Sequence, residues 1–272
     1  MIARPKTVLV PEKEIEHITN WIRNYFADNG SADTCAVIGI SGGKDSTVAA
    51  ALCARAIGAD RVVGVLMPNG EQEDIDVARR VCEHLGIRSM ELNIYDLTTS
   101  FYDTLLNFSG STLNSKVYNN SPARIRMSLL YAVAAMVGGR VVCTCNRSEE
   151  YVGWSTKYGD AAGDFAPLLD YTVREVKTIG QYLGLPDEFV NKVPIDGLCG
   201  KTDEESFGFT YEQLDAYILD AEVPDVNTLG NIKWLHNNSH HKRRALCIPH
   251  CRALTQHPIG EEWKHGGYYE EF

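Results

Sequence analysis

The chain is organised around one stretch, Gly39-Ile40-Ser41-Gly42-Gly43-Lys44-Asp45-Ser46. An apolar run at 35–38 precedes it, and an apolar helical pattern at 47–53 follows it. This order predicts a buried strand, a tight glycine turn and the first turn of a helix. Such a turn directs backbone N–H groups to one point, where the helix dipole adds partial positive charge. The stretch is therefore predicted to hold phosphate, with Lys44 adding a full charge and Asp45 a carboxylate for a metal ion.

Length and composition narrow the class of protein. The 272 residues contain neither an internal repeat nor a clear linker, so we expect a single domain over 1–272. A net charge of −10 argues against nucleic acid as a partner, because phosphate-backbone binding needs a basic face. No signal-peptide core or membrane-spanning apolar run is present, and the scattered cysteines are typical of free thiols. We expect a cytoplasmic protein without a membrane partner.

Strand-like and helix-like segments alternate along the first half of the chain. This alternation implies right-handed crossovers and a parallel sheet. We expect an α/β fold, a Rossmann-like doubly wound sheet of five parallel strands with helices on both faces. Four strands are recognisable as apolar runs, at 35–40, 61–67, 89–94 and 140–145. Helical patterns cover 11–26, 73–85, 97–108, 119–136, 173–183, 211–219 and 226–235. The polar, aperiodic segment 194–208 predicts a mobile surface loop.

The glycine turn does not match the two commonest nucleotide-binding motifs. A Walker loop needs Ser or Thr directly after its Lys, whereas Asp45 follows Lys44 here. The dinucleotide fingerprint GxGxxG is also absent. The turn instead resembles the pyrophosphate loop of the ATP pyrophosphatases, which cleave ATP to AMP and pyrophosphate. The loop alone does not distinguish among the members of that group.

A second polar stretch follows the last predicted strand. It reads T-x-N-x-S-E at 144–149 and T-K-Y-G-D-x-x-x-D-x-x-P-L at 156–168. Ligands of open parallel sheets bind at the carboxyl ends of the strands, so Glu149 is expected at the same edge as Asp45. Two carboxylates beside a triphosphate suit Mg²⁺, which prefers hard oxygen ligands. Judged on residue types alone, a solvated charged loop is an equally good interpretation.

These motifs together resemble the ammonia-dependent NAD synthetases. Further matching segments are Ala123-Arg124-Ile125-Arg126-Met127, Lys201-Thr202-Asp203-Glu204, Phe207-Gly208-Phe209-Thr210-Tyr211 and His241-Lys242-Arg243-Arg244. They run in order from about 39 to 244, so the resemblance covers most of the chain. Without it, Arg124 would be read as part of a solvated helix face and 240–244 as an exposed basic run.

The resemblance implies a set of site residues. ATP would be bound by Gly39, Ile40, Ser41, Gly42, Gly43, Lys44, Asp45, Ser46 and Thr144. Arg174 and Lys201 are added to this set, because Val173 and Ile195 replace nucleotide contacts that are common in the family. Mg²⁺ would be bound by Asp45 and Glu149. Deamido-NAD would be contacted by Arg124, Lys157, Asp164, His241 and Lys242. Asp160 would border the ammonia site, and the catalytic candidates are Lys44, Asp45 and Asp160.

The implied reaction is the last step of NAD biosynthesis. ATP activates the nicotinate carboxylate of deamido-NAD as an acyl-adenylate, and ammonia then displaces AMP. Only about thirty residues precede the first predicted strand, too few for a glutaminase domain, so free ammonia is the expected nitrogen donor. The resemblance also implies a homodimer. Two alternatives remain open, another ATP pyrophosphatase such as a tRNA-thiolating enzyme, and a non-catalytic ATP-binding module.

Overall fold

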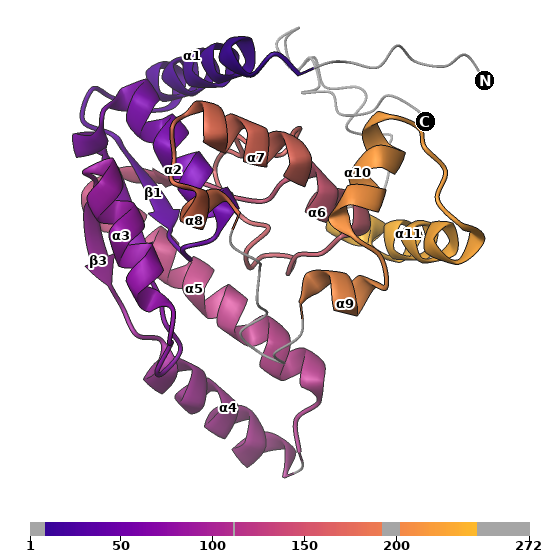
Figure 1. Cartoon of the computed structure of the whole chain (residues 1–272). Coiled ribbons are helices and arrows are strands. Elements are labelled where there is room, and N and C mark those ends of the chain that lie inside the picture. The colour runs from indigo at the N-terminus through magenta and orange to yellow at the C-terminus, as the bar shows by residue number, and fades with distance from the viewer. Residues whose placement is uncertain (1–8, 111, 192–201, 244–272) are drawn as a thin grey trace, which may run out of the picture.

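A parallel β-sheet forms the centre of the molecule in the computed structural model, which describes residues 9–110, 112–191 and 202–243 (Figure 1). Its strands are β1 Cys35–Gly39, β2 Val62–Leu66, β3 Arg88–Glu91 and β4 Gly139–Val141. Their order is β3-β2-β1-β4, and every neighbouring pair is parallel. Gly39 pairs with Val65, so the glycine turn begins at the carboxyl end of a central strand.

The prediction of five strands is wrong, because the sheet in the described residues has four. Beyond β4 the chain makes only one isolated parallel bridge, between Val142 and Phe165. The carboxylate of Asp164 accepts the outward N–H of Val141 at 2.7 Å, in the position where the backbone carbonyl of a fifth strand would act. A side chain thus takes over one of the ladder's hydrogen bonds. The backbone beside it adds two more, since the N–H of Asp164 donates to Val141 and the N–H of Cys143 donates to Phe165, but no fifth strand forms.

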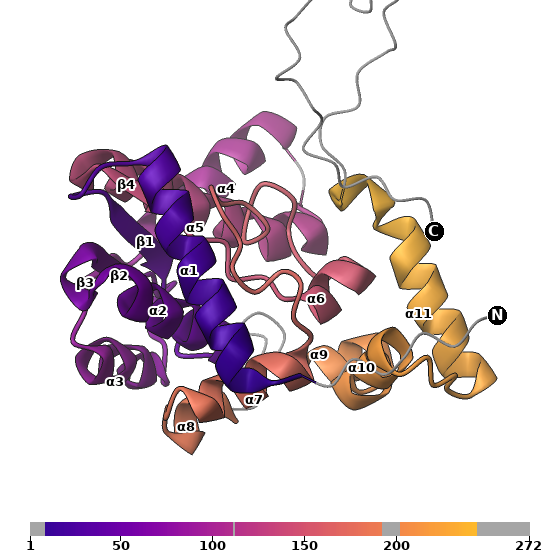
Figure 2. The same ribbon diagram turned by 90° about the horizontal axis from the view of Figure 1, so that it is seen from above.

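Helices cover both faces of the sheet, which confirms the doubly wound α/β fold (Figures 1 and 2). One face packs on α1 Pro11–Asn29, α2 Lys44–Ile57, α3 Ile75–Leu85, α7 Val173–Tyr182 and α8 Asp187–Val190. The other face packs on α5 Ser115–Val137, against which α4 Tyr95–Ser109 lies. Ala36 and Ile38 enter the first core and Cys35 and Val37 the second, because alternate residues of a strand point to opposite faces.

A third, smaller core joins the helices beyond the sheet (Figure 2). They are α6 Arg147–Val152, α9 Asp203–Phe207, α10 Tyr211–Leu219 and α11 Val226–Asn238. Two short 3₁₀ turns, Ala59–Arg61 and His240–Lys242, complete the secondary structure. Part of the segment predicted as a mobile loop is therefore helical, because Thr202 and Glu205 form a capping box and Phe207 is buried. Residues 192–201 of that segment lie outside the described residues.

None of the helices within these described ranges has the length and apolar character that a membrane crossing requires.

Candidate active site

The turn between β1 and α2 is shaped to face an anion. Gly42 has a φ of 77°, a left-handed conformation that favours glycine, and a Cβ there would lie 3.0 Å from the backbone nitrogen of Ala78. Ser41 and Ser46 brace the turn, with their hydroxyl oxygens 3.1 Å apart. No side chain caps the N-terminus of α2, so its first N–H groups remain for an external acceptor.

Lys44 and Asp45 begin α2, and their side chains are joined across the site to α6. Lys44 is buried, and its Nζ lies 2.9 Å from Oδ2 of Asp45. The other oxygen of Asp45 accepts a 3.0 Å hydrogen bond from the amide nitrogen of Asn146. Asn146 in turn shares a capping box with Glu149, whose backbone N–H donates to the side-chain oxygen Oδ1 of Asn146 at 3.0 Å. The structure thus brings Asp45 and Glu149 together through Asn146.

The electrostatics show a surplus of carboxylates around one ammonium. Burial, followed by the neighbouring Asp45, raises the pKa of Glu149 well above its ordinary value. Burial works to lower the pKa of Lys44, but Asp45, Glu149 and Asp203 outweigh it and the pKa is raised. An added cation would therefore be stabilised between these oxygens.

Three residues of this site were missed by the sequence analysis. Asn146 lies within the T-x-N-x-S-E motif, and its spacing to Glu149 is that of a helix cap, a signal that was available. Tyr211 places its ring 5.6 Å from Nζ of Lys44, and its hydroxyl donates to Asp203 at 2.9 Å. These two side chains come from α9 and α10, and no local pattern connects them with the glycine turn.

A second group of predicted residues gathers around the loop 153–164. Nε of Arg124 donates to the carbonyl of Lys157 at 3.3 Å, and Nζ of Lys157 donates to the carbonyl of His241. Nζ of Lys242 donates to two carbonyls of this loop, both at 2.7 Å. The carboxylate of Asp160 accepts the N–H of Thr156 at 2.9 Å, and burial raises its pKa.

Burial lowers the pKa of Lys242, although Asp160 and Glu150 work to raise it, so this ammonium lies near two carboxylates.

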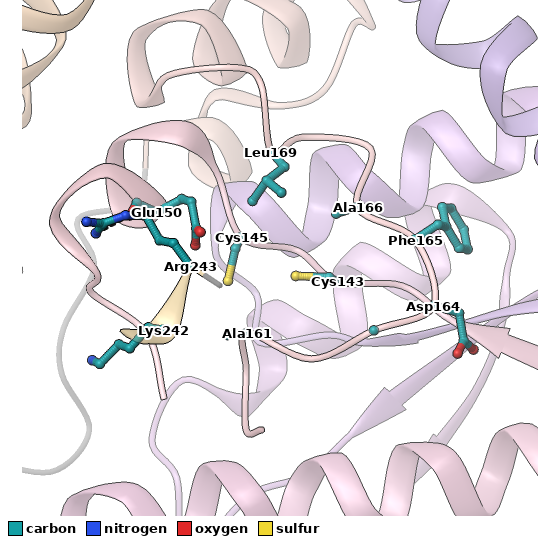
Figure 3. A pocket seen from close by; sticks show the side chains of 11 residues that line it. Cys143, Cys145, Glu150, Ala161, Asp164, Phe165, Ala166, Leu169, Lys242 and Arg243 are labelled. Atoms are coloured by element: carbon teal, nitrogen blue, oxygen red, sulfur yellow. Dashed lines mark hydrogen bonds between the residues drawn. The ribbon is translucent and has the colours of Figure 1, made fainter. Parts of the chain in front are cut away.

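The remaining candidates are more scattered. Asp164 is bound to the sheet edge, at the opposite end of the cavity in Figure 3 from Lys242. Thr144 follows β4, half-buried, at the carboxyl edge. The guanidinium of Arg174 is paired with Asp220 at 2.9 Å, so the structure directs its charge to α10 rather than to the turn. Lys201 lies outside the described residues.

The donor set suits a magnesium ion that also takes ligands from its substrate. Among the residues that the structure describes, no group of three or more His, Cys, Asp or Glu side chains is placed to hold a metal alone. Asp45 and Glu149 offer hard carboxylate oxygens, and Mg²⁺ is commonly held by one or two carboxylates together with phosphates and waters. The residues present therefore fit this ion.

Comparison with known proteins gives a consistent picture. The NAD synthase family model matches residues 14–245. The NH(3)-dependent NAD(+) synthetase of Thermococcus kodakarensis is 38% identical over 249 residues, which are 86% of this chain and 96% of that protein. Its counterpart in Pyrococcus furiosus is 36% identical over 261 residues, 91% of this chain and 98% of that protein.

Solved structures of similar proteins have the same fold as this chain. The NMN synthetase of Francisella tularensis has a TM-score of 0.79 and 31% identity, covering 89% of this chain and 99% of that one. The NH3-dependent NAD synthetase of Campylobacter jejuni has a TM-score of 0.72 and 28% identity, covering 89% and 100%. The family model and these relatives match the part of the chain that contains the glycine turn and the paired carboxylates, and the chain belongs to the NAD synthase family.

Proposed function

We propose that the protein amidates deamido-NAD with ammonia and cleaves ATP to AMP and pyrophosphate, giving NAD. The observation that carries this proposal is the joined set Lys44, Asp45, Asn146 and Glu149, at the uncapped start of α2. Membership of the NAD synthase family supports it, as do the names of the relatives, NH(3)-dependent NAD(+) synthetases.

The chemistry requires activation of a carboxylate. Ammonia does not displace hydroxide from a carboxylate, so the nicotinate oxygen first attacks the α-phosphorus of ATP. Pyrophosphate leaves, and an acyl-adenylate remains. Ammonia then attacks the acyl carbon and AMP leaves. The N–H groups of the turn and the ammonium of Lys44 would stabilise the departing pyrophosphate, and the protein's main contribution is positioning.

Asp45 and Glu149 would hold Mg²⁺ in this proposal. When bound, the ion supplies positive charge that neutralises the phosphate oxygens. Asn146 orients the carboxylate of Asp45 with one hydrogen bond, and Lys44 binds the other oxygen of the same carboxylate. These contacts hold the two carboxylates ready, so little reorganisation is needed when ATP enters.

The loop 153–164 and the basic residues gathered around it would bind the second substrate. Arg124, Lys157, His241 and Lys242 would face the phosphates and the carboxylate of deamido-NAD, for which guanidinium and ammonium groups are well suited. Asp160 would border the approach of ammonia, where a carboxylate can accept a hydrogen bond from ammonium. Thr144 would touch the nucleotide of ATP from the end of β4.

A mononucleotide is the second candidate substrate. The Francisella tularensis structure described as an NMN synthetase resembles this chain as closely as the NAD synthetase structures do. Nicotinic acid mononucleotide carries the same carboxylate and lacks only the adenylyl half. The preferred substrate therefore depends on the part of the site that would hold the adenylyl half. Measuring activity with each of the two compounds identifies that substrate.

The direct experiment is to measure AMP formed from ATP, Mg²⁺ and ammonium with deamido-NAD, with the mononucleotide, or with neither. We expect AMP only with an acceptor, and faster with deamido-NAD. AMP formation that ignores both acceptors would refute the proposal, and a preference for the mononucleotide would reassign the substrate. Glutamine in place of ammonium tests the nitrogen donor, and we expect it to be inactive.

Substitution of the carboxylates tests their role. Asp45→Asn and Glu149→Gln should each lower the rate at least about 100-fold, because a metal-held charge contributes several kcal/mol. Asp76→Asn is a matched control, since Asp76 occupies the first turn of α3 as Asp45 does that of α2. If either variant kept full activity, the proposed role of that carboxylate in binding the metal would be refuted.

We further propose that the protein works as a homodimer in the cytoplasm. Helices α4 and α5 leave large apolar side chains exposed, including Phe108 at 93% and Met136 at 80%. A second copy would cover such a surface. Light scattering of the purified protein measures the mass directly, and a monomer at micromolar concentration would contradict the proposal.

A further inference from the structure

Two thiols lie together directly after β4, and the proposed reaction does not use them. Cys143 and Cys145 are two positions apart in extended chain, so their side chains share one side. Each thiol donates to the same acceptor, the backbone carbonyl of Asp160, at 3.7 Å and 3.4 Å. In Figure 3 the sulfur of Cys143 points toward Cys145, and the sulfur of Cys145 points toward the segment that carries Ala161.

These thiols are buried in the protein but border a cavity. Cys143 is 6% exposed and Cys145 is 5% exposed, and both line a space of about 330 Å³. Glu150, Lys242 and Arg243 line the same space, so charged groups of both signs border it (Figure 3). Small polar molecules can therefore reach the pair without opening the core.

Cys143 differs from the other buried cysteines. Burial raises the pKa of Cys53 to about 12 and that of Cys82 to about 11, which makes them poor nucleophiles. The neighbouring Cys145 lowers the pKa of Cys143, whereas Cys143 and burial raise the pKa of Cys145 well above its ordinary value. Cys143 is therefore the more readily ionised partner, with a resolving thiol beside it.

We propose that Cys143 and Cys145 form a reversible dithiol–disulfide pair that hydroperoxides oxidise. The Cys143 thiolate attacks one peroxide oxygen, the O–O bond breaks, and an alcohol or water leaves after taking up a proton. Cys143 is then a sulfenic acid. The Cys145 thiol attacks its sulfur, an S–S bond forms, and water leaves. Two thiols lose two electrons and two protons, and one peroxide is reduced.

The bond formed this way is expected to reduce easily. Two residues of extended chain span roughly 6.6 Å, which is two rises of about 3.3 Å. Disulfides join Cα atoms that are about 4.4–6.8 Å apart, so this pair lies at the upper end of the range. Strain of this kind raises the reduction potential, which suits a regulatory rather than a structural disulfide.

Oxidation would release the loop that carries substrate candidates. Both S–H donors to the carbonyl of Asp160 are lost when the disulfide forms. That loop holds Asp160 and Lys157, so its loosening should lower the rate of amidation. This consequence rests on the proposed function, whereas the oxidation itself does not.

Mass spectrometry of the full-length protein tests the oxidation independently of activity. Trypsin should release Val141–Arg147, which contains both thiols. After treatment with hydrogen peroxide and then an alkylating agent, we expect this peptide unalkylated and lighter by two hydrogens, with restoration by dithiothreitol. Double alkylation after peroxide, or oxygen addition that dithiothreitol does not reverse, would overturn the proposal.

Activity tests the consequence. Peroxide should lower AMP formation by the wild type at least fivefold, and dithiothreitol should restore it. Cys143→Ser and Cys145→Ser keep a hydroxyl donor for the Asp160 carbonyl, so both should keep basal activity. Cys143→Ser should resist peroxide, whereas Cys145→Ser should still be oxidised at Cys143 but form no disulfide. A disulfide that leaves the rate unchanged would overturn the regulatory role. Absence of any amidation would leave the peptide result standing and refute the proposed function instead.

Discussion

Asn146 joins the two carboxylates of the candidate active site, and one substitution separates its two roles. The side chain is fully buried, and its amide nitrogen donates to Asp45 at 3.0 Å. Its carbonyl oxygen caps α6 by accepting from the N–H of Glu149. Asn146→Ser keeps a helix cap of similar strength, because Ser and Asn rank together at this position. The variant loses the donor to Asp45.

The expected effect follows from that one bond. Hydrogen bonds to charged groups contribute about 1.5–3 kcal/mol. Because each 1.36 kcal/mol is tenfold in rate, kcat/KM for AMP formation should fall by roughly 10-fold to 150-fold. Asp45 would then be oriented by Lys44 alone, so we also expect half-maximal activity to need more Mg²⁺. The assay is a magnesium titration at fixed ATP and deamido-NAD, with thermal unfolding measured in parallel.

Asn114→Ser supplies the matched control. Asn114 caps α5 through an equivalent bond from the N–H of Val117 at 3.2 Å, but it is exposed and has no partner in the site. We expect this variant to retain wild-type activity. If Asn146→Ser were as active as the control, Asn146 would have no positioning role. If its activity fell only in proportion to the folded fraction, the role would be structural.

Two further predictions concern packing and pH. Gly163→Ala should destabilise the protein by about 1–3 kcal/mol, because a Cβ there would lie 2.5 Å from the backbone nitrogen of Cys143. Gly230→Ala, in open space within α11, should stabilise it by up to about 1 kcal/mol, and equal melting temperatures for the two variants would contradict this. Burial lowers the pKa of His236 below 6.5, so the unfolded chain binds the proton more tightly and stability falls as pH drops below that value. His236→Asn should reduce this dependence between pH 7.5 and pH 5.5 in urea melts, and a dependence equal to that of the wild type would refute the assignment.

Most of the fold follows from apolar periodicity along the chain. The predicted strands and helices occur, because buried strands and amphipathic helices leave clear local patterns. The outer edge of the sheet, at β4, does not follow from apolar periodicity. The run at 140–145 predicts a strand of six residues, yet β4 ends at Val141, and its outer edge is met by the side chain of Asp164 and one isolated bridge to Phe165. No local pattern indicates that a carboxylate will replace a strand.

The candidate site was predictable to the extent that it lies in short motifs. Asp45 and Glu149 were expected at one sheet edge, and the structure places them there with Asn146 between them. Tyr211 and Asp203 reach Lys44 from helices more than a hundred residues further along the chain. Their place depends on the third core, where α9 and α10 pack, and packing of that range leaves no spacing rule in the sequence.

Charge explains why the glycine turn alone does not define the function. The N–H groups of the turn and Lys44 would attract any phosphate, but three carboxyl groups, those of Asp45, Glu149 and Asp203, surround that single ammonium. A free triphosphate would be repelled by such a set, whereas a triphosphate carrying a divalent cation would be attracted by it. In the proposed reaction the carboxylates would therefore favour metal-bound ATP, and they would do so because the later motifs bring Glu149 and Asp203 beside the turn. The proposed reaction therefore depends on the fold bringing these segments together. Taken separately, each segment indicates only a phosphate-binding loop or a charged surface.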